Sequence, residues 1–418
     1  MTLPETELIR LLGALLALLL ASQIMGGVMQ KLRQPRVIGE ILGGLMLGPT
    51  VLGAVAPGAY QALFKATATQ EQILAFVFWL GLLLLMFCSG LETQSVRSRS
   101  EWKTALWLTA TGTLIPLGAG LFVARSFDFS PFFGPQATPV SFALVLAMAI
   151  AVTSIPVISK IFFDAGLHGT PFARVVLTAA MIEDMLLWVL LSVTLGLAHA
   201  WHGDAWMLAK GVLLTIGYFA FCQGLGHRIY DGISRASWNP FKTSADGMPL
   251  LLVFLLAVLL AFLLGVNPIF GAFLAGRVVA NSERITSETK AQVMGFSFAL
   301  FIPVYFASVG LKLNLIAGFP VVAFGLILAF ACVVKALAAY LGARLAGQRS
   351  ATSWHLAIAM NARGGPGIVL ATVTLEAGLI SGGFYAILVV LSLVTSQMAG
   401  WWLQRVTQAN LSQLEVAV

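Results

Sequence analysis

The chain has 418 residues, of which 59% are hydrophobic and only 10% are charged. Soluble domains carry about 25% charged residues, so this composition excludes a soluble protein and indicates one that crosses a membrane several times. The net charge of +7 comes from single lysines and arginines scattered through short loops, a pattern that does not indicate a nucleic-acid partner. Cys88, Cys222 and Cys332 lie in apolar segments without metal-ligand spacing, so we expect no disulfide framework, no zinc site and no cofactor.

Apolar runs recur along the whole chain. A transmembrane helix needs about 20 predominantly apolar residues. The predicted spans are 8–29, 37–54, 73–89, 105–123, 140–161, 172–198, 206–223, 248–266, 267–280, 294–311, 321–345, 354–375 and 384–403. We therefore expect an all-α polytopic membrane protein with thirteen transmembrane helices that forms a single unit over residues 1–418.

The positive charges of the loops orient these helices. Lysine and arginine favour the cytoplasmic side of a membrane. If the N-terminus is outside, the external face holds only Arg10, Lys65, Arg125, Lys210 and Lys312, while the other loop lysines and arginines are cytoplasmic. We expect an integral protein of the cell (inner) membrane with its N-terminus outside and its C-terminus in the cytoplasm.

Two segments far apart in the chain resemble each other. GEILGG at 39–44 matches GAFLAG at 271–276, and each follows a proline by a few residues. The two segments lie seven predicted spans apart, an odd number, so they enter the membrane from opposite faces. This indicates inverted repeats, which many secondary transporters possess and which place the substrate site near the middle of the membrane.

The repeat predicts a matched pair of broken helices. In the fifth span, Thr153 and Ser154 come just before Pro156, which cannot donate a backbone hydrogen bond. In the twelfth span, NARGGPG at 361–367 cannot hold a regular helix. Unwound backbone at membrane depth occurs where it lines a cavity, and its carbonyls can then hold an ion. The residues that we expect to form this break are Asn361, Arg363, Gly364, Gly365 and Pro366.

Glu183 and Asp184 are adjacent carboxylates in the apolar run 172–198. An ionisable group at the centre of a membrane helix costs at least about 2.5–3.5 kcal/mol and usually marks an ion or proton pathway. Lys335 lies near the middle of its own span and has no route to an interface, so it needs a carboxylate partner or it must lose its proton. Glu183 lies at a matching depth of about 15 Å. We expect a Glu183–Lys335 ion pair that leaves Asp184 free to bind a cation; the alternative is a polar cluster that only holds helices together.

Two further charged residues lie inside predicted spans, and each has two interpretations. Arg363 either holds the C-terminal end of a half-helix or pairs with Glu40 or Glu376. Glu40, just inside the second span, is either a cytoplasm-facing gate residue or a buried helix-capping partner.

Several short motifs resemble the monovalent cation/proton antiporter-2 family, which includes sodium/proton exchangers and Kef-type transporters. They are RQPRVIGE at 33–40, GPTVLG at 48–53, GLE at 90–92, TSIP at 153–156, NPIFGAF at 267–273 and SVGL at 308–311. The resemblance runs from about residue 8 to residue 403 in matching order, and the combination is specific although each piece is short.

The resemblance implies thirteen helices with two crossing discontinuous helices, a fold that works as a homodimer. It implies a transport core, which we place at about 72–200 and 294–380. This core moves against dimerisation helices at about 8–54, 248–281 and 384–403, with a linker helix at about 206–226. No C-terminal regulatory domain is expected, since the chain ends shortly after its last span.

The resemblance also implies roles for single residues. Asp184 resembles the essential carboxylate of the family, which binds the proton and the transported monovalent cation. Lys335 resembles the lysine that pairs with the preceding acid, and Thr153 and Ser154 fall at the unwound crossing. Glu183 departs from the family, which has Asp, Gln or Asn at this position.

The expected function is exchange of protons for Na⁺ or K⁺ by alternating access, with Asp184 alternately binding proton and cation. An antiporter of the same fold that exports an organic ion or an ionophore–cation complex is one alternative, and a channel-like cation efflux protein is another. We expect no enzymatic activity, because the sequence shows neither metal-binding histidine spacing nor a serine–lysine dyad.

Overall fold

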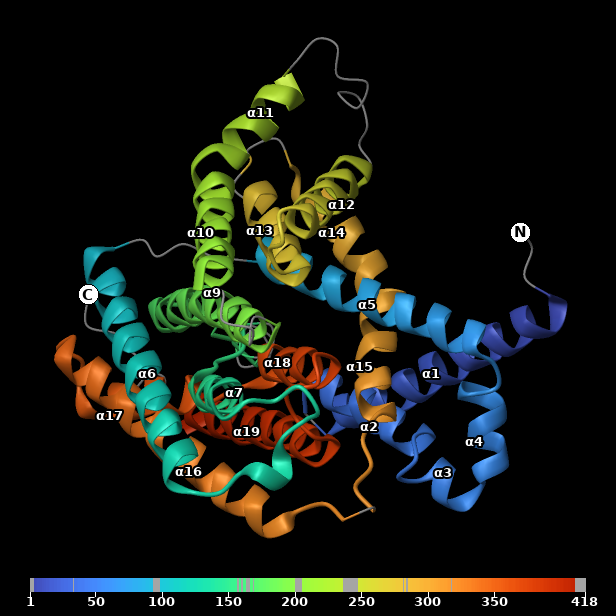
Figure 1. Cartoon of the computed structure of the whole chain (residues 1–418). Helices are drawn as coiled ribbons and strands as arrows, with labels where there is room; N and C mark the ends of the chain where they lie inside the picture. Colours follow the sequence, from blue (N-terminus) through green and yellow to red (C-terminus); the bar gives the residue numbers. More distant parts are fainter. Residues whose placement is uncertain are drawn as a thin grey trace. The chain divides into compact units, whose positions relative to one another are not determined.

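The structure is a computed structural model, and it describes residues 4–32, 34–92, 98–155, 158, 161–162, 166–167, 169–199, 205–235, 247–280, 282, 285–316 and 318–409. In this part of the chain the regular structure is helical (Figure 1), with an isolated β-bridge between Phe133 and Ile380. Nine described helices are long and apolar enough to cross a membrane, and three shorter apolar helices accompany them. The all-α polytopic architecture is confirmed, whereas the count of thirteen spans stays a prediction.

The chain divides into two compact units, each built from both halves of the sequence. Unit 1 comprises Met1–Thr93 and Ala209–Asn314, and unit 2 comprises Gln94–Leu208 and Leu315–Val418. This division differs from the predicted core and dimerisation helices, because it groups the third and tenth predicted spans with unit 1 and the last span with unit 2. Which helices move and which dimerise is a separate question, and those roles stay predictions.

Unit 1 repeats one pattern of helix packing. Its helices are α1 (Glu5–Lys31), α2 (Arg36–Leu47), α3 (Leu52–Val55), α4 (Pro57–Phe64), α5 (Ala68–Leu91), most of α10 (Ala205–Phe221), α11 (His227–Arg235), α12 (Met248–Leu263), α13 (Pro268–Ala280), α14 (Ser287–Phe296) and α15 (Ile302–Leu311), with π-helical segments Cys222–Gly226 and Ser297–Phe301. In the N-terminal segment of unit 1, α2 packs on α1, and in its C-terminal segment α13 packs on α12 in the same way. Each of these inner helices also packs on a helix of the other segment: α2 contacts α15, and α13 contacts α5.

The glycines of the two similar segments explain this packing. A Cβ atom at Gly44 on α2 would lie 1.7 Å from the carbonyl oxygen of Ala307, and one at Gly276 on α13 would lie 2.1 Å from that of Phe87. Both glycines therefore allow helix backbones to approach closely, as small residues do in membrane proteins. Their equivalent places in the packing support the predicted inverted repeat.

Unit 2 contains the helices that are interrupted inside the membrane region. It contains α6 (Arg99–Ser126), a 3₁₀ turn (Ser130–Phe132), α7 (Pro139–Ala151), α9 (Pro171–His199), α16 (Val321–Leu345), α17 (Ser350–Ala359), α18 (Gly364–Glu376) and α19 (Gly382–Ala409). Helix α6 packs against α7, α9 and α16. A bidentate ion pair joins the first turns of α6 and α9, because Arg174 donates to the two carboxylate oxygens of the buried Glu101 at 2.5 and 3.1 Å.

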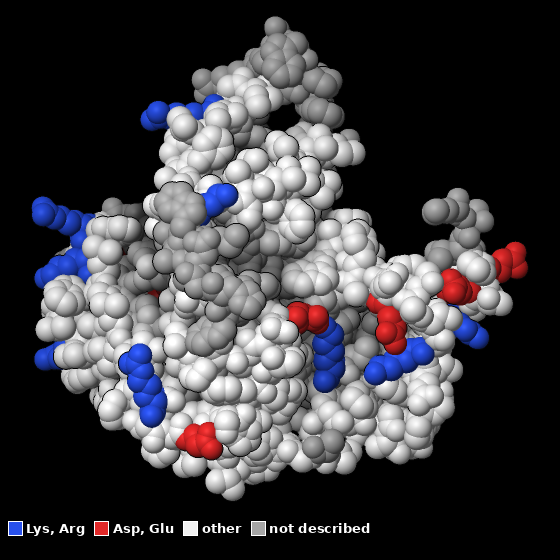
Figure 2. Space-filling model, viewed as in Figure 1, with Lys and Arg blue, Asp and Glu red and all other residues white. Residues whose placement is uncertain are grey.

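Apolar side chains cover much of the outer surface. Leu12 on α1, Leu256 on α12 and Leu326 on α16 are each more than half exposed. On the face shown in Figure 2, charged side chains are few and broad uncharged areas separate them. Large exposed apolar areas of this kind are costly in water and suit the hydrocarbon core of a bilayer.

Candidate functional site

Two interrupted helices cross inside unit 2. Helix α7 ends at Ala151 and the chain continues in an extended conformation at Val152. The hydroxyl of Thr153 donates to the carbonyl oxygen of Met360 at 2.7 Å, and the backbone N–H of Ser154 donates to that of Ala362 at 2.6 Å. The Ser154 hydroxyl in turn accepts from the backbone N–H of Gly365 at 3.1 Å. These bonds satisfy buried polar groups that the helix breaks would leave unpaired.

The second break is shorter than the sequence predicts. Helix α17 ends at Ala359 and α18 begins at Gly364, so only residues 360–363 are unwound, whereas we expected an interruption through 361–367. Gly364, Gly365 and Pro366, which we expected to form part of the break, therefore lie in the first turn of α18 and not in the unwound segment. A proline is tolerated there because the first backbone N–H groups of a helix have no partner within it. Gly364 has φ of +27°, which suits a residue without Cβ. Pro156, the proline of the first break, lies outside the described residues.

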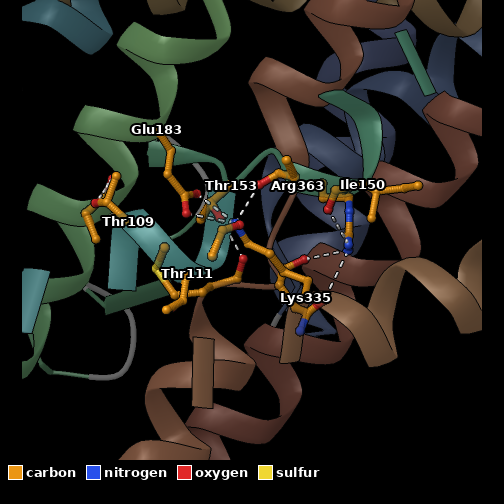
Figure 3. A network of polar contacts seen from close by, with 12 residues as sticks. Thr109, Thr111, Ile150, Thr153, Glu183, Lys335 and Arg363 are labelled. Atoms are coloured by element: carbon orange, nitrogen blue, oxygen red, sulfur yellow. Dashed lines mark hydrogen bonds and ion pairs between the residues drawn. The ribbon is translucent and has the colours of Figure 1, made fainter. Parts of the chain in front are cut away.

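Arg363 lies in the second break and is fully buried. Its guanidinium donates to the carbonyl oxygens of Ala149 and Ile150, both at 3.2 Å (Figure 3). These carbonyls belong to the last turn of α7, which carries the negative end of the helix dipole. Further bonds reach the carbonyl oxygen of Ala331 on α16 at 2.8 Å and two oxygens of Asn361 at 3.2 Å. Arg363 thus holds the end of a half-helix, which is the first of its two expected arrangements.

Lys335 and Glu183 meet as an ion pair, as their matching depth predicts. The Nζ atom of Lys335 lies 2.8 and 2.9 Å from the two carboxylate oxygens of Glu183, and both side chains are buried (Figure 3). Nζ also donates to the carbonyl oxygens of Gly112 at 2.9 Å and of Ala151 at 2.5 Å. A lysine has three N–H donors, so these acceptors use all of them. The ammonium therefore links α6, α7, α9 and α16 at one point.

Asp184 is buried beside this ion pair, with 1% of its surface exposed. In the part of the chain that the structure describes, neither carboxylate oxygen of Asp184 has a hydrogen-bond partner. A buried charge without partners is very unfavourable, so such a carboxylate must bind a proton or a cation. Thr153 of the first break lies beside the neighbouring Glu183 (Figure 3).

A small cavity adjoins Glu183. Its volume is about 20 Å³, and leucines, Met148 and Thr113 line it together with Glu183. This is room for about one water molecule. The buried hydroxyl of Thr113 has no hydrogen-bond partner among the described residues. Sequence reasoning did not identify Thr113 or Gly112, because neither carries a charge that stands out in an apolar run.

Glu40 lies in unit 1, on α2. It is buried and accepts a hydrogen bond from Nε of Arg36, one helical turn earlier, at 3.1 Å. Arg36 also donates to the side chain of Gln23 on α1. The ion pair gives Glu40 a partner on its own helix, and a role as a gate stays a prediction.

Glu92, from the GLE motif, comes directly after α5 and is partly buried. Burial disfavours the ionised carboxylate and raises the pKa of Glu92 from 4.5 to about 7. Between these two values the unfolded chain has lost the proton while the folded chain keeps it. Glu92 therefore lowers the free energy of unfolding progressively as the pH rises from about 5 to about 7, and below that range it has no effect.

We expect Glu92→Gln to remove this pH dependence. One pKa unit corresponds to about 1.4 kcal/mol, so the variant should melt several degrees above the wild type at pH 8 and nearly equal it at pH 5. Thermal unfolding in detergent between pH 5 and pH 8 measures the difference. Glu5→Gln, at an exposed glutamate, is the control and should follow the wild type. A constant difference at every pH would contradict the assignment.

Comparison with protein families gives one match over nearly the whole chain. A family model described as "Sodium/hydrogen exchanger, transmembrane" matches residues 14–409. A relative from Synechocystis sp., named Na(+)/H(+) antiporter NhaS4, is 26% identical over 93% of this chain and 95% of its own length. The Na(+)/H(+) antiporter of Enterococcus hirae is 24% identical over 92% of this chain and 95% of its own length.

Other relatives are longer. The K(+)/H(+) antiporter 1 of Saccharomyces cerevisiae is 28% identical over 87% of this chain, but the match spans only 42% of that protein. Among solved structures, the sodium proton antiporter MjNhaP1 from Methanocaldococcus jannaschii superposes with a TM-score of 0.69 at 16% identity, over 96% of this chain and 99% of that one. This likeness concerns the fold.

Proposed function

Because the chain belongs to the sodium/hydrogen exchanger family, we propose that it is a secondary active antiporter that exchanges protons for Na⁺ or K⁺ by alternating access. Relatives of similar length are named sodium antiporters and a longer one is named a potassium antiporter, so the proposal covers both cations. The observation that carries it is the buried carboxylate of Asp184, which lies without a hydrogen-bond partner in the described chain next to an ion pair.

In the proposed cycle Asp184 binds either a proton or the cation. A single carboxylate cannot hold both, so binding of one displaces the other, and this competition couples the two fluxes. The cation also needs neutral oxygen ligands, which the Thr153 hydroxyl and the carbonyls of the broken helices supply, together with water. Ser154 contributes by holding the crossing together through its bonds to Ala362 and Gly365.

Glu183 and Lys335 have a different role in this cycle. Their charges compensate each other, and Lys335 has its donors fixed on Glu183 and two backbone carbonyls. A cation at Asp184 therefore lies beside a neutral pair and not beside a free ammonium, which would repel it. The transport core would be unit 2, which contains all of these residues, and a homodimer in the inner membrane remains part of the proposal.

Asp184→Asn tests the proposal, because the amide keeps the size of the side chain but can neither ionise nor carry the transported proton. We expect proteoliposomes containing this variant to keep an imposed pH gradient when Na⁺ or K⁺ is added, while wild-type vesicles dissipate it. Asp128→Asn is the matched control, since Asp128 is exposed after α6 and accepts a hydrogen bond from the backbone N–H of Ser130. Exchange by a folded Asp184→Asn protein at the wild-type rate would disprove the assignment.

A further inference from the structure

Gly112 lies near the middle of α6, where glycine is not the expected residue. Glycine is less favourable than alanine inside a helix, because it loses more backbone freedom on folding. Its φ angle is not among the positive values found at other glycines of the chain, so the backbone conformation does not require glycine. The reason for a glycine here must therefore be space.

The space around Gly112 is filled by the ion pair. A Cβ atom at this position would lie 2.9 Å from Oε1 of Glu183 and 3.6 Å from Nζ of Lys335, and among the described residues no other atom outside its own helix lies within 4 Å. Gly120 and Gly342 differ, because a Cβ atom at either would meet the backbone of a neighbouring helix. Those two glycines serve helix packing, whereas Gly112 makes room for charged side-chain ends.

A small cavity adjoins Glu183, but hydrogen bonds hold its carboxylate in place. Both of its oxygens accept from Lys335, and the side chain is 3% exposed. Lys335 is in turn bonded to the carbonyl oxygen of Gly112 itself. A methyl group on residue 112 would therefore push the carboxylate off the ammonium that holds it.

We propose that Gly112 is a positioning residue that sets the length of the acid at position 183: glycine admits glutamate, whereas alanine would require aspartate. Aspartate is shorter by one methylene group, about 1.5 Å. This retreat would turn a 2.9 Å clash into an ordinary van der Waals contact. The inference rests on the proposed exchange function and deepens it, because it explains how this chain accommodates a glutamate next to the cation-binding Asp184.

A cycle of four proteins tests the inference: wild type, Gly112→Ala, Glu183→Asp and the double variant. We expect Gly112→Ala to lower the rate of cation-dependent proton exchange at least about tenfold, the loss typical of one displaced charge-assisted bond. Glu183→Asp alone should lose activity partly, because the shorter acid retreats from Lys335. The double variant should recover from the Gly112→Ala level to about the level of Glu183→Asp, since the shorter acid no longer clashes with the added methyl group. Gly118→Ala on the same helix, where a Cβ atom would meet nothing within 4 Å, should behave as the wild type.

The apparent cation affinity is measured alongside the rate, because a merely structural effect would lower the amount of active protein without changing the affinity. We expect Gly112→Ala to change the affinity and the double variant to return it to that of Glu183→Asp. Wild-type behaviour of Gly112→Ala, or a double variant whose loss is the product of the two single losses, would overturn the inference.

Melting temperatures of the same four proteins keep the test independent of the proposed function. Alanine favours the helix, so a lower melting temperature for Gly112→Ala that the second substitution reverses reports the clash alone. If the wild type exchanged no cation, the proposed function would be disproved. The melting temperatures of the four proteins would still test whether Gly112 positions the acid at position 183. Additive changes in melting temperature would reject it.

Discussion

Lys335→Met is expected to lower the free energy of unfolding by about 3–5 kcal/mol, the cost of removing one partner of a buried ion pair. Methionine fills a similar space without the charge. It leaves the Glu183 carboxylate, 3% exposed, without its ammonium, and it leaves the carbonyl oxygens of Gly112 and Ala151 without the donor they share. Chemical unfolding in detergent measures this loss.

A second substitution separates the ion pair from mere packing. In Lys335→Met/Glu183→Gln the buried negative charge is gone as well, and replacing both partners of a buried pair is far less costly than removing one. The double variant should therefore recover a substantial part of the stability. Lys103→Met, at an exposed lysine on α6, should stay within about 0.5 kcal/mol of the wild type. A Lys335→Met protein as stable as that control would show that the pair does not hold the site together.

The charged residues of the site could be predicted because ionisable groups stand out in apolar runs. Glu183, Asp184, Lys335 and Arg363 were all identified in this way. The contact between Lys335 and Glu183 followed from their similar depth in the membrane, and the structure places them 2.8 Å apart. The family was also identifiable from its short motifs, and the family model matches residues 14–409.

The partners of those charges could not be predicted, because most are backbone carbonyls. Arg363 donates hydrogen bonds to the carbonyl oxygens of Ala149, Ile150 and Ala331. Lys335 donates one to the carbonyl oxygen of Ala151. Every residue has such an oxygen, so only the packing of the helices decides which of them faces a cation. Gly112 had a weak signal as a glycine in mid-helix, but glycines are frequent in all membrane helices.

The sequence pattern also could not predict which helices pack together in each unit. Hydropathy indicates that a run crosses the membrane but not which neighbours it contacts. The family resemblance placed α5 and α15 in the transport core together with the site, and that role stays a prediction. In the structure α5 packs on α13 and α15, whereas α19 packs on α18 in the unit that contains the site. The packing of α13 on α5, which resembles that of α2 on α15, accompanies the place of α5 and α15 in unit 1.

Arg363→Met should lower the free energy of unfolding by at least about 3 kcal/mol. The arginine is fully buried, and its loss leaves two carbonyl oxygens at the end of α7 without the donor that the structure provides. Each buried acceptor left unpaired costs about 1–3 kcal/mol, and the uncompensated end of the helix dipole adds to this. Thermal and chemical unfolding in detergent measure the loss. Arg349→Met, at an exposed arginine before α17, is the control.

Arg363→Lys distinguishes the two physical contributions. Lysine keeps the positive charge at the end of α7, but its single ammonium group cannot reproduce the fork that reaches Ala149, Ile150 and Asn361 at once. We therefore expect Arg363→Lys to recover less than half of the stability lost in Arg363→Met, and proteoliposome exchange to stay low in both. Full recovery with lysine would show that charge alone stabilises the half-helix. In that case the crossing depends on the dipole and not on the geometry of the guanidinium.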